Sequence, residues 1–392
     1  MTATVLPPEA SRRILPALAT STAPDVWVHR FDDRTHGWTL AVATHAAPGS
    51  SQLSLGGFRI APDERMRSEG FTPEREAIAL AMGMEEKVRW SRLLGVGGPL
   101  AKRDLSRIVG GKCVLAPTPD ARVGQPNDRA LLDFAIAGFQ AIERESGIFL
   151  VTGQDLGHGM LHDGSASSLA YLNARYRGSV VADTSGPTAE GNVQVLLGML
   201  RAAEVPIARA TVLLIGCGNI GMHMVERLRP MGVTLLVCES RAERRAELAA
   251  LGIRAVGPEG KLALLAEPVD AVVVNAAGGS LDAATIAACV ANPRLQVICG
   301  SENLAMPDPA GTDALRRGRK SSCPTERGEM MGYLTAVEEY LAKADGVPFD
   351  VATVMRAAAA LEPAAHEATA RQRAGGFAET FEQVVEGMMT QG

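Results

Sequence analysis

The sequence lacks any apolar run long enough to cross a bilayer, and it lacks an excess of positive charge. Its 392 residues include 39 Lys and Arg against 44 Asp and Glu, which gives a net charge of −5. A nucleic-acid-binding protein needs a basic footprint, and a spanning helix needs about 20 consecutive apolar residues. Pro16 interrupts the short apolar patch near the N-terminus, which argues against a signal peptide. We therefore expect a cytoplasmic protein without nucleic-acid or membrane partners.

The sequence also lacks a C-x-x-C pair. Its six cysteines are scattered, and several lie in apolar runs such as LLVCES and QVICGS. This placement is typical of buried reduced thiols and argues against a disulfide framework or a zinc site. The composition, 46% hydrophobic and 21% charged, is that of a globular protein, and the length suits two domains.

The clearest motif is TVLLIGCGNIGMHMVERL at residues 211–228, an apolar run followed by G-x-G-x-x-G and a helical pattern. Gly216 permits a tight turn, Gly218 lets the backbone approach a pyrophosphate, and Gly221 allows the helix to pack closely on the strand. Asn219 and Ile220 complete the fingerprint. The combination of strand, glycine turn and helix predicts a dinucleotide-binding site.

An acidic residue follows at the distance that such a site requires. Glu239 ends the second apolar run, 23 residues after Gly216, where a carboxylate accepts hydrogen bonds from the adenine-ribose hydroxyls. A carboxylate there repels a 2′-phosphate, so we expect NAD rather than NADP. Ser240, Arg241 and Arg244 follow directly and could hold the phosphate in a rotated arrangement, which keeps NADP as the alternative.

Beyond residue 210, short apolar runs alternate with helical patterns. The runs cover 211–215, 233–238, 271–275 and 295–300. Continuous apolar runs of this length predict a parallel sheet covered by helices on both faces. We therefore expect an α/β protein whose second domain is a doubly wound Rossmann fold.

The first half of the chain has a different pattern. Apolar runs at 26–31, 38–45, 53–60 and 108–115 predict strands, and apolar residues at three- and four-residue intervals predict a helix over 74–94. Lys112 lies in an apolar, glycine-flanked run, and burial favours the neutral amine that a general base needs. Asp155 follows another apolar run, and Gly56 and Gly57 open the backbone to a small ligand. Each feature alone also fits a strand edge, a turn or a bulge.

Taken in order, seven segments of this sequence resemble the glutamate/leucine/phenylalanine/valine dehydrogenase family, and the leucine dehydrogenase branch most closely. The segments are LGGFRI, LAMGMEEK, VGGKCVL, TGQDLG, TSGPTAEG, GCGNIG and ICGSEN. The resemblance extends from about residue 25 to residue 340. It implies a substrate-binding and oligomerisation domain at 1–187, an NAD-binding domain at 188–340 and C-terminal helices at 341–392 that return to the first domain. It places the active site in the cleft between the two domains, in a homo-oligomer.

The resemblance also implies a reaction, the reversible oxidative deamination of an L-α-amino acid to a 2-oxo acid and ammonia. Lys112 would be the base that activates water, and Asp155 would exchange a proton with the substrate nitrogen. Lys87, in the M-x-x-K position, would hold the substrate carboxylate near Gly56 and Gly57. The residues implied at the nicotinamide end of the cofactor are Thr188, Ala276 and Asn303.

Three departures from the family pattern affect the substrate site. Lys87 and Lys112 are 25 residues apart, about twice the family's usual separation, and Lys102 inside the apparent insertion is a rival for the carboxylate. Glu329 replaces an asparagine, and Tyr333 replaces an aliphatic residue. We therefore expect an unusual substrate in a specialised pathway.

His158 and His162 have the i, i+4 spacing of metal ligands on a helix, but glycines surround them and no third ligand is obvious. We expect no metal, and interpret His158 as a substrate contact or an ordinary loop residue. Two other functions remain open. One keeps the fold and cofactor but reduces an imine or aminates an unusual oxo compound. The other is a non-catalytic nucleotide sensor, for which neither Lys112 nor Asp155 would be needed.

Overall fold

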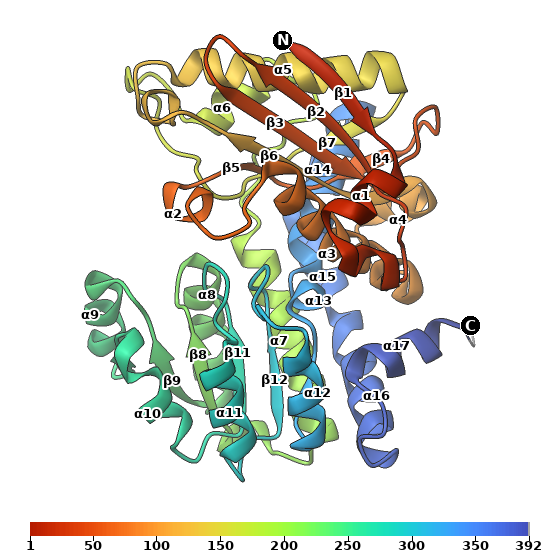
Figure 1. Cartoon of the computed structure of the whole chain (residues 1–392). Helices are drawn as coiled ribbons and strands as arrows, with labels where there is room; N and C mark the ends of the chain where they lie inside the picture. Colours follow the sequence, from red (N-terminus) through yellow and green to blue (C-terminus); the bar gives the residue numbers. More distant parts are fainter. Residues whose placement is uncertain (391–392) are drawn as a thin grey trace. The chain divides into compact units, whose positions relative to one another are not determined.

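The structure is a computed structural model that describes residues 1–390, and the chain forms two compact units (Figure 1). The first unit contains Met1–Arg89, Pro99–Ala182 and Tyr333–Phe349. The second contains Trp90–Gly98, Asp183–Gly332 and the chain from Asp350 onward. The expected boundary at 187/188 lies close to the observed division. The expected return of 341–392 to the first domain differs, because only the part up to Phe349 groups with the first unit.

A seven-stranded mixed sheet forms the frame of the first unit. The strand order is β1-β2-β3-β6-β4-β7, and β5 also pairs with β6. The strands are β1 (Thr2–Leu6), β2 (Trp27–Asp33), β3 (Trp38–Thr44), β4 (Leu53–Leu55), β5 (Phe58–Ile60), β6 (Ile108–Ala116) and β7 (Phe149–Val151). The expected single strand over 53–60 is two strands, because Gly56 and Gly57 interrupt it. Strand β1, which pairs antiparallel with β2, was not expected from the sequence.

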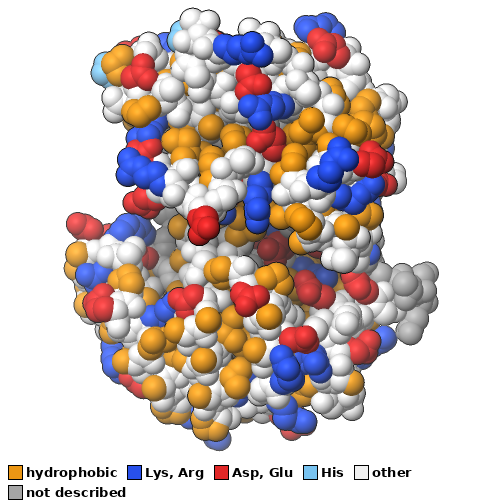
Figure 2. Space-filling view, in the orientation of Figure 1, with side chains coloured by type: hydrophobic (Ala, Val, Ile, Leu, Met, Phe, Trp, Pro, Cys, Tyr) orange, Lys and Arg blue, Asp and Glu red, His pale blue; other side chains and the backbone are white. Residues whose placement is uncertain are grey.

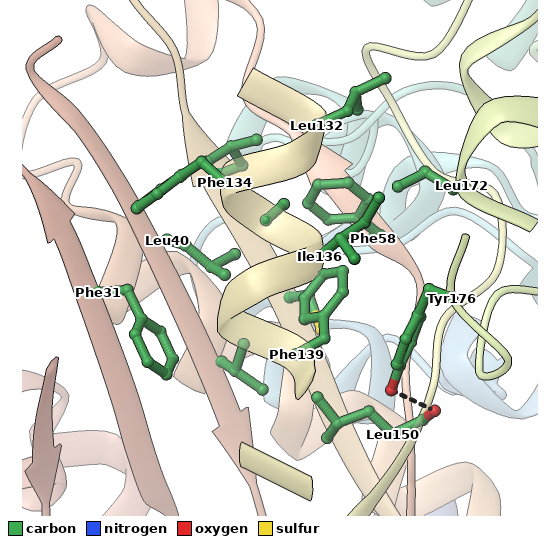
Figure 3. Close-up of a cluster of buried hydrophobic side chains, with 14 of the residues drawn as sticks. Phe31, Leu40, Phe58, Leu132, Phe134, Ile136, Phe139, Leu150, Leu172 and Tyr176 are labelled. Atoms are coloured by element: carbon green, nitrogen blue, oxygen red, sulfur yellow. Dashed lines mark hydrogen bonds between the residues drawn. The ribbon is translucent and has the colours of Figure 1, made fainter. Parts of the chain in front are cut away.

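Helix α5 (Asp128–Ser146) covers one face of this sheet, and the core lies between them (Figures 1 and 3). Phe139 of the helix packs edge-on against Phe58 of β5. The buried Tyr176 hydroxyl donates to the Leu150 carbonyl at 3.1 Å. Cys113 and Leu115 of β6 belong to this core. Since side chains alternate along a strand, Lys112 points to the opposite face of the sheet.

Helix α3 (Pro73–Leu94) approaches β6 at Gly110. A Cβ on Gly110 would lie 2.3 Å from the Glu85 amide nitrogen, so a larger residue would push α3 away from the sheet. The Gly110 amide donates to Glu85 Oε2 at 2.6 Å. The other helices of this unit are α1 (Pro8–Ile14), α2 (Asp63–Met66), α4 (Pro99–Asp104), α6 (Ser168–Asn173) and most of α14 (Met330–Asp345).

The second unit contains a six-stranded parallel sheet in the order β10-β9-β8-β11-β12-β13. The strands are β8 (Thr211–Ile215), β9 (Thr234–Cys238), β10 (Arg254–Val256), β11 (Ala271–Val274), β12 (Val297–Gly300) and β13 (Ser321–Ser322). This is the doubly wound order, in which the first three strands are added toward one edge of the sheet and the last three toward the other. The order switches between the first and fourth strands, here β8 and β11. The Rossmann fold expected from the alternating pattern is confirmed.

Helices cover both faces of this sheet (Figure 1). The helices of this unit are α7 (Ser185–Ala202), α8 (Asn219–Leu228), α9 (Ala242–Ala250), α10 (Lys261–Leu265), α11 (Ala283–Ala291), α12 (Ala310–Arg317), α13 (Thr325–Gly328), α15 (Val351–Ala357), α16 (Leu361–Ala374) and α17 (Phe381–Thr390). Helix α16 packs along α7 so closely that a Cβ on Gly198 would lie 2.2 Å from the Glu362 carbonyl oxygen. This contact is the physical reason that the C-terminal helices group with the second unit.

Figure 2 shows acidic and basic side chains interspersed on the visible face of each unit. All six cysteines are free and buried, as their apolar surroundings predicted. Among residues 1–390, no helix combines the length and the apolar character that crossing a membrane requires.

Candidate functional site

Lys112 and Asp155 form an ion pair in the first unit. Lys112 lies in the middle of β6, and Asp155 lies in the loop after β7. Their side chains are only 4% and 8% exposed. A buried ion pair needs further polar partners to offset the loss of hydration, and Asp155 has them. Its Oδ1 accepts from the Leu156 amide at 2.7 Å and from Arg59.

Arg59 of β5 bridges two carboxylates. Its Nε and Nη2 donate to Asp155 Oδ1 at 3.3 and 3.2 Å, and its Nη1 donates to Glu76 Oε1 at 2.5 Å. Glu76 lies in the first turn of α3 and also accepts from Arg65 Nε at 2.9 Å. The four charged side chains Arg65, Glu76, Arg59 and Asp155 therefore alternate in sign and end on Lys112.

This network determines which form of Asp155 is populated. Burial alone would favour the neutral acid, but Lys112 and Arg59 outweigh it and hold the pKa of Asp155 well below its usual range. Burial also disfavours the charged guanidinium, yet Asp155 and Glu76 together raise the pKa of Arg59. Asp155 is consequently a carboxylate wherever the protein is folded near neutral pH.

Gly57 lies directly against this pair. A Cβ built there would lie 3.0 Å from Lys112 Nζ and 3.2 Å from Asp155 Cβ. Gly56 is different, since its Cβ would meet the Gly111 carbonyl oxygen at 1.9 Å. Packing of β6 explains the glycine at 56, and the absence of a side chain at Gly57 lets its backbone lie against two charged groups.

The two lysines proposed for the substrate carboxylate lie in different surroundings. Lys87 of α3 is 1% exposed, and its Nζ lies 3.5 Å from Met84 Sδ. Its helix is the one that touches β6 two residues from Lys112. Lys102 lies on α4 and is exposed. Lys87 is therefore the buried one of the two lysines, and Lys102 the exposed one.

Tyr333 is buried in α14, and Ala336 lies one turn further on. A Cβ on Gly153, two residues before Asp155, would touch the Ala336 Cβ at 3.9 Å. This face of α14 therefore lies beside the loop that carries Asp155.

Both ring nitrogens of His158 have protein partners. Nδ1 lies 2.9 Å from Ser168 Oγ, and Nε2 lies 2.7 Å from the Phe58 carbonyl oxygen. Burial is the main cause of its lowered pKa. The ring therefore supports the start of β5, next to Arg59, which agrees with an ordinary loop histidine. Within residues 1–390, His, Cys, Asp and Glu side chains form no group of three or more that could hold a metal ion.

The glycine turn of the second unit has the form that a dinucleotide pyrophosphate requires. Gly216 has φ +86°, and a Cβ there would lie 2.7 Å from the Ala276 amide nitrogen. At Gly218 a Cβ would approach nothing closer than Arg241 Nη2 at 3.9 Å, so this position is open. Helix α8 begins directly afterwards, and Asn219 and Ile220 contribute unpaired backbone amides of its first turn. The backbone therefore fits the cofactor that the motif predicted.

Glu239 occupies the end of β9, and its carboxylate is held by backbone amides. Oε2 accepts from Cys217 N at 2.8 Å, and Oε1 accepts from Arg241 N at 2.9 Å and from Arg241 Nε at 3.1 Å. Ser240 Oγ lies 3.4 Å from the same oxygen. Burial opposes ionisation, but these donors outweigh it and lower the pKa of Glu239.

Two further loops meet at the ends of β11 and β12. The buried Glu302 accepts from Ala276 N at 3.0 Å and from Ser280 N at 2.8 Å. Asn303 Nδ2 donates to Glu329 Oε1 at 3.4 Å. The structure thus brings Ala276, Asn303 and Glu329 together around Glu302, and Gly216 touches the same loop. Thr188 is buried in the first turn of α7, where its hydroxyl lies 2.6 Å from the place of a Cβ on Gly332.

Sequence reasoning missed Arg59, Glu76, Glu302 and Asn275. Asn275 follows β11, and its Oδ1 accepts from Ser301 Oγ at 2.8 Å. Its position at the carboxyl end of a parallel strand could have indicated it, since ligands bind there in doubly wound sheets. Arg59 and Glu76 gave no such signal, because their role depends on a contact between β5 and α3.

The sequence matches no protein-family model and no curated protein. Among solved structures, the fold is similar to L-tryptophan dehydrogenase from Nostoc punctiforme, with 17% identity, a TM-score of 0.64, and coverage of 91% of this chain and 93% of that one. It is also similar to a hetero-hexameric glutamate dehydrogenase from Thermus thermophilus in a Leu-bound form, with 14% identity, a TM-score of 0.64, and coverage of 90% and 83%. For the glutamate dehydrogenase of Peptoniphilus asaccharolyticus these values are 14%, 0.60, 98% and 97%.

At these identities the likeness shows the fold alone. The two-domain architecture expected from the sequence, a mixed α/β domain and a Rossmann domain, is confirmed over nearly the whole chain by structures named as amino-acid dehydrogenases. None of these three is named as a leucine dehydrogenase, so the resemblance to that branch stays a prediction.

Proposed function

We propose that this protein is an NAD-dependent oxidoreductase that converts an L-α-amino acid, water and NAD⁺ into a 2-oxo acid, ammonium, NADH and a proton, and catalyses the reverse reaction. The observation that carries the proposal is the buried Lys112–Asp155 pair beside Gly57, in a chain whose other unit has an intact dinucleotide turn. A binding protein has no need of a buried amine that is paired with a carboxylate and lies against a glycine. Perturbed, paired titratable groups of this kind concentrate at catalytic sites.

The first unit supplies the proton transfers. Lys112 removes a proton from the water that attacks the imine carbon, and Asp155 exchanges a proton with the substrate nitrogen. Lys87 pairs with the substrate carboxylate, and the substrate Cα lies beside Lys112 and Asp155. Low exposure of Lys112 and Asp155 keeps bulk water away from the charges, which strengthens their interactions with the substrate.

The second unit holds the dinucleotide, which accepts the hydride from Cα when it is bound. The turn at Gly216, Gly218 and Gly221 and the first amides of α8 hold the pyrophosphate. Glu239 accepts the adenine-ribose hydroxyls and favours NAD. Thr188, Ala276 and Asn303 hold the nicotinamide end.

The substrate is the finer part of the proposal. Tyr333 on α14 and Glu329 replace an aliphatic residue and an asparagine of the resembling family. A carboxylate at Glu329, already bonded to Asn303, suits a substrate with a hydrogen-donating or cationic side chain. We accordingly propose a divergent relative of the leucine dehydrogenase branch that acts on a specialised amino acid, as a homo-oligomer.

A different reaction with the same fold and cofactor is the second candidate function, because Glu329 adds a carboxylate beside Asn303. In that case the same pair of units would reduce an imine or aminate an oxo compound other than a common 2-oxo acid.

The test is formation of NADH at alkaline pH with a panel of amino acids, each offered with NAD⁺ and NADP⁺. The panel comprises the standard amino acids, ornithine, homologous aliphatic and aryl-substituted amino acids. Turnover of a subset supports the proposal, and the preferred side chain reports what Glu329 and Tyr333 select. If NADH binds, as seen by its fluorescence, and nothing in the panel is oxidised, amino-acid oxidation is wrong. The reductive direction with ammonium and oxo compounds then tests the second candidate.

A further inference from the structure

A second, more distant carboxylate is connected to the Lys112–Asp155 pair. Arg59 uses Nε and Nη2 on Asp155 Oδ1 and Nη1 on Glu76 Oε1, at 3.3, 3.2 and 2.5 Å. Arg59 and Glu76 are 5% and 4% exposed, so water screens neither charge effectively. Because a guanidinium is planar and rigid, the bond to Glu76 fixes the direction of the two donors that face Asp155.

The geometry distributes the two oxygens of Asp155 between two cations. Oδ1 takes Arg59 and the Leu156 amide, whereas Oδ2 takes Lys112. If Arg59 rotated, Asp155 Oδ1 would lose two of its three donors. The orientation of Asp155 Oδ2 toward Lys112 Nζ therefore depends on Glu76, although Glu76 does not itself contact Asp155.

A neighbouring pair shows that an Arg–Glu contact on this helix does not by itself serve the site. Glu74, two residues before Glu76 in the same first turn of α3, also binds an arginine, Arg30 of β2. The Glu74 side chain is 6% exposed, close to the 4% of Glu76. The other carboxylate of Arg30 is Asp32, which lies on the same strand and not at the Lys112 pair.

We propose that Glu76, acting through Arg59, is a positioning residue that sets the orientation of Asp155 and the proton affinity of the Lys112–Asp155 pair. The inference rests on the proposed function for its catalytic meaning, but its test does not require turnover. Lys112 and Asp155 touch the substrate in the proposed reaction, whereas Arg59 and Glu76 act through them.

The other charged or titratable groups around the pair stay unchanged in the test. They are His158 on the loop of Asp155, Glu85 and Lys87 on α3, and Arg65, which binds the second oxygen of Glu76.

The experiment measures the pH at which the Lys112 amine reacts half-maximally with acetic anhydride, read by mass spectrometry of the peptide that contains Lys112. Only the neutral amine reacts, so the midpoint reports the pair directly. The variants are Glu76→Gln, Arg59→Gln, the double variant, and Glu74→Gln as the matched control. Circular dichroism and NADH fluorescence confirm that each variant is folded.

We expect Arg59→Gln to raise the midpoint by about one pH unit, because Asp155 then loses one of its two cations and stabilises the Lys112 ammonium more strongly. Glu76→Gln should raise the midpoint too, by a smaller amount, because Arg59 without its anchor turns away from Asp155 Oδ1. The decisive result is the coupling between the two sites. If Glu76 acts through Arg59, Glu76→Gln has little effect in the Arg59→Gln background, and Glu74→Gln has none in either. An equal shift by Glu76→Gln in both backgrounds would mean a direct long-range charge effect and would overturn the proposal, as would an equal shift by Glu74→Gln.

If Arg59→Gln does not fold, Arg59→Lys replaces it. A single ammonium cannot bind both carboxylates in the geometry of the fork, so the coupling must again diminish. With any amino acid that is turned over, Arg59→Lys should lower kcat more than it raises the KM for NAD⁺. Coupling without turnover of any substrate would leave the positioning role standing and remove the proposed reaction. Turnover with no coupling would support the proposed reaction and overturn the positioning role of Glu76.

Discussion

Lys112 and Asp155 meet as an ion pair although 43 residues separate them in the chain, one in the middle of β6 and the other after β7. Between these strands lies only β4, which pairs in parallel with both. The pair is therefore anchored by three adjacent strands, and a change in either side chain should alter chemistry before it alters the fold.

The first prediction concerns Lys112. Lys112→Ala should reduce kcat by at least about a hundredfold, because a positioned proton-transfer group contributes at least this much. NADH binding should persist, since the dinucleotide turn belongs to the other unit. The measurements are steady-state kinetics and NADH fluorescence. Arg59 still compensates the Asp155 charge in the variant, so it should fold. Wild-type kcat in the variant would remove Lys112 from the mechanism.

The second prediction separates the two lysines proposed for the substrate carboxylate. Lys87→Ala should raise the KM for the amino acid by about tenfold or more, because a buried charge-assisted bond is lost. Lys102→Ala is the matched control and should change KM by less than about twofold, because Lys102 is exposed on α4. The opposite ranking would assign the carboxylate to Lys102.

The third prediction concerns the space at Gly57. Gly57→Ala places a methyl group 3.0 Å from Lys112 Nζ and 3.2 Å from Asp155 Cβ. We expect kcat/KM to fall by about tenfold or more, because the added methyl group pushes the flexible end of Lys112 away from Asp155 and misplaces the proton-transfer group. Gly387→Ala in α17 is the control, because no atom lies within 4 Å of the added Cβ and its φ, like that of Gly57, is not positive. A large loss of Tm in Gly57→Ala alone would indicate a packing role.

The fourth prediction concerns cofactor choice. Glu239→Gln should weaken NADH binding and improve NADPH binding, moving their affinity ratio by about tenfold, because the repulsive charge is lost and Arg241 is released from its ion pair. Fluorescence titration with both cofactors measures it. Glu226→Gln, on the exposed side of α8, should leave the ratio unchanged. An unaltered ratio in Glu239→Gln would place the ribose elsewhere.

The fifth prediction concerns acid stability. Burial lowers the pKa of His29 from 6.5 to about 4, and that of His45 similarly. Above pH 6.5 neither state is protonated at these rings, so stability is unaffected. As the pH falls from 6.5 to about 4, the unfolded chain binds the proton first and the folded state loses stability, by up to about 3 kcal/mol for the buried His29.

Urea unfolding of the wild type and of His29→Gln at several pH values between 7.5 and 4.5 tests this. The variant should have a shallower decline toward acid, by up to about 1.4 kcal/mol per pH unit. If the stabilities of the wild type and the variant declined in parallel with falling pH, the folded protein would protonate His29 as readily as the unfolded chain does, and the prediction would be wrong.

The sequence predicted the second unit well because each of its signals is local. Strand, glycine turn, helix and Glu239 lie within about 30 residues, and parallel strands of continuous apolar residues admit few other arrangements. The apolar run around Lys112 predicted a strand, but not the direction of its side chain, because Val114 is as apolar as Cys113 and Leu115.

What the sequence could not provide were relations across the fold. Arg59 looked like a residue of an apolar run, and Glu76 looked like an acidic residue at a helix start. Only the packing of α3 on the sheet gives them a common role. The C-terminal helices were predicted to return to the first domain, whereas those after Phe349 pack in the second unit. The reason is similar, since Gly198, which lets α16 pack closely on α7, lies inside an ordinary helical pattern.

Glu302 has a consequence for motion. Its carboxylate, carried by the loop after β12, receives the amides of Ala276 and Ser280 from the loop after β11. Neither loop can open without breaking bonds to the other, so in hydrogen–deuterium exchange these two amides should open as one unit with a single protection factor. We therefore expect the two loops to move together, and any opening of the second unit during a catalytic cycle to involve other loops of that unit.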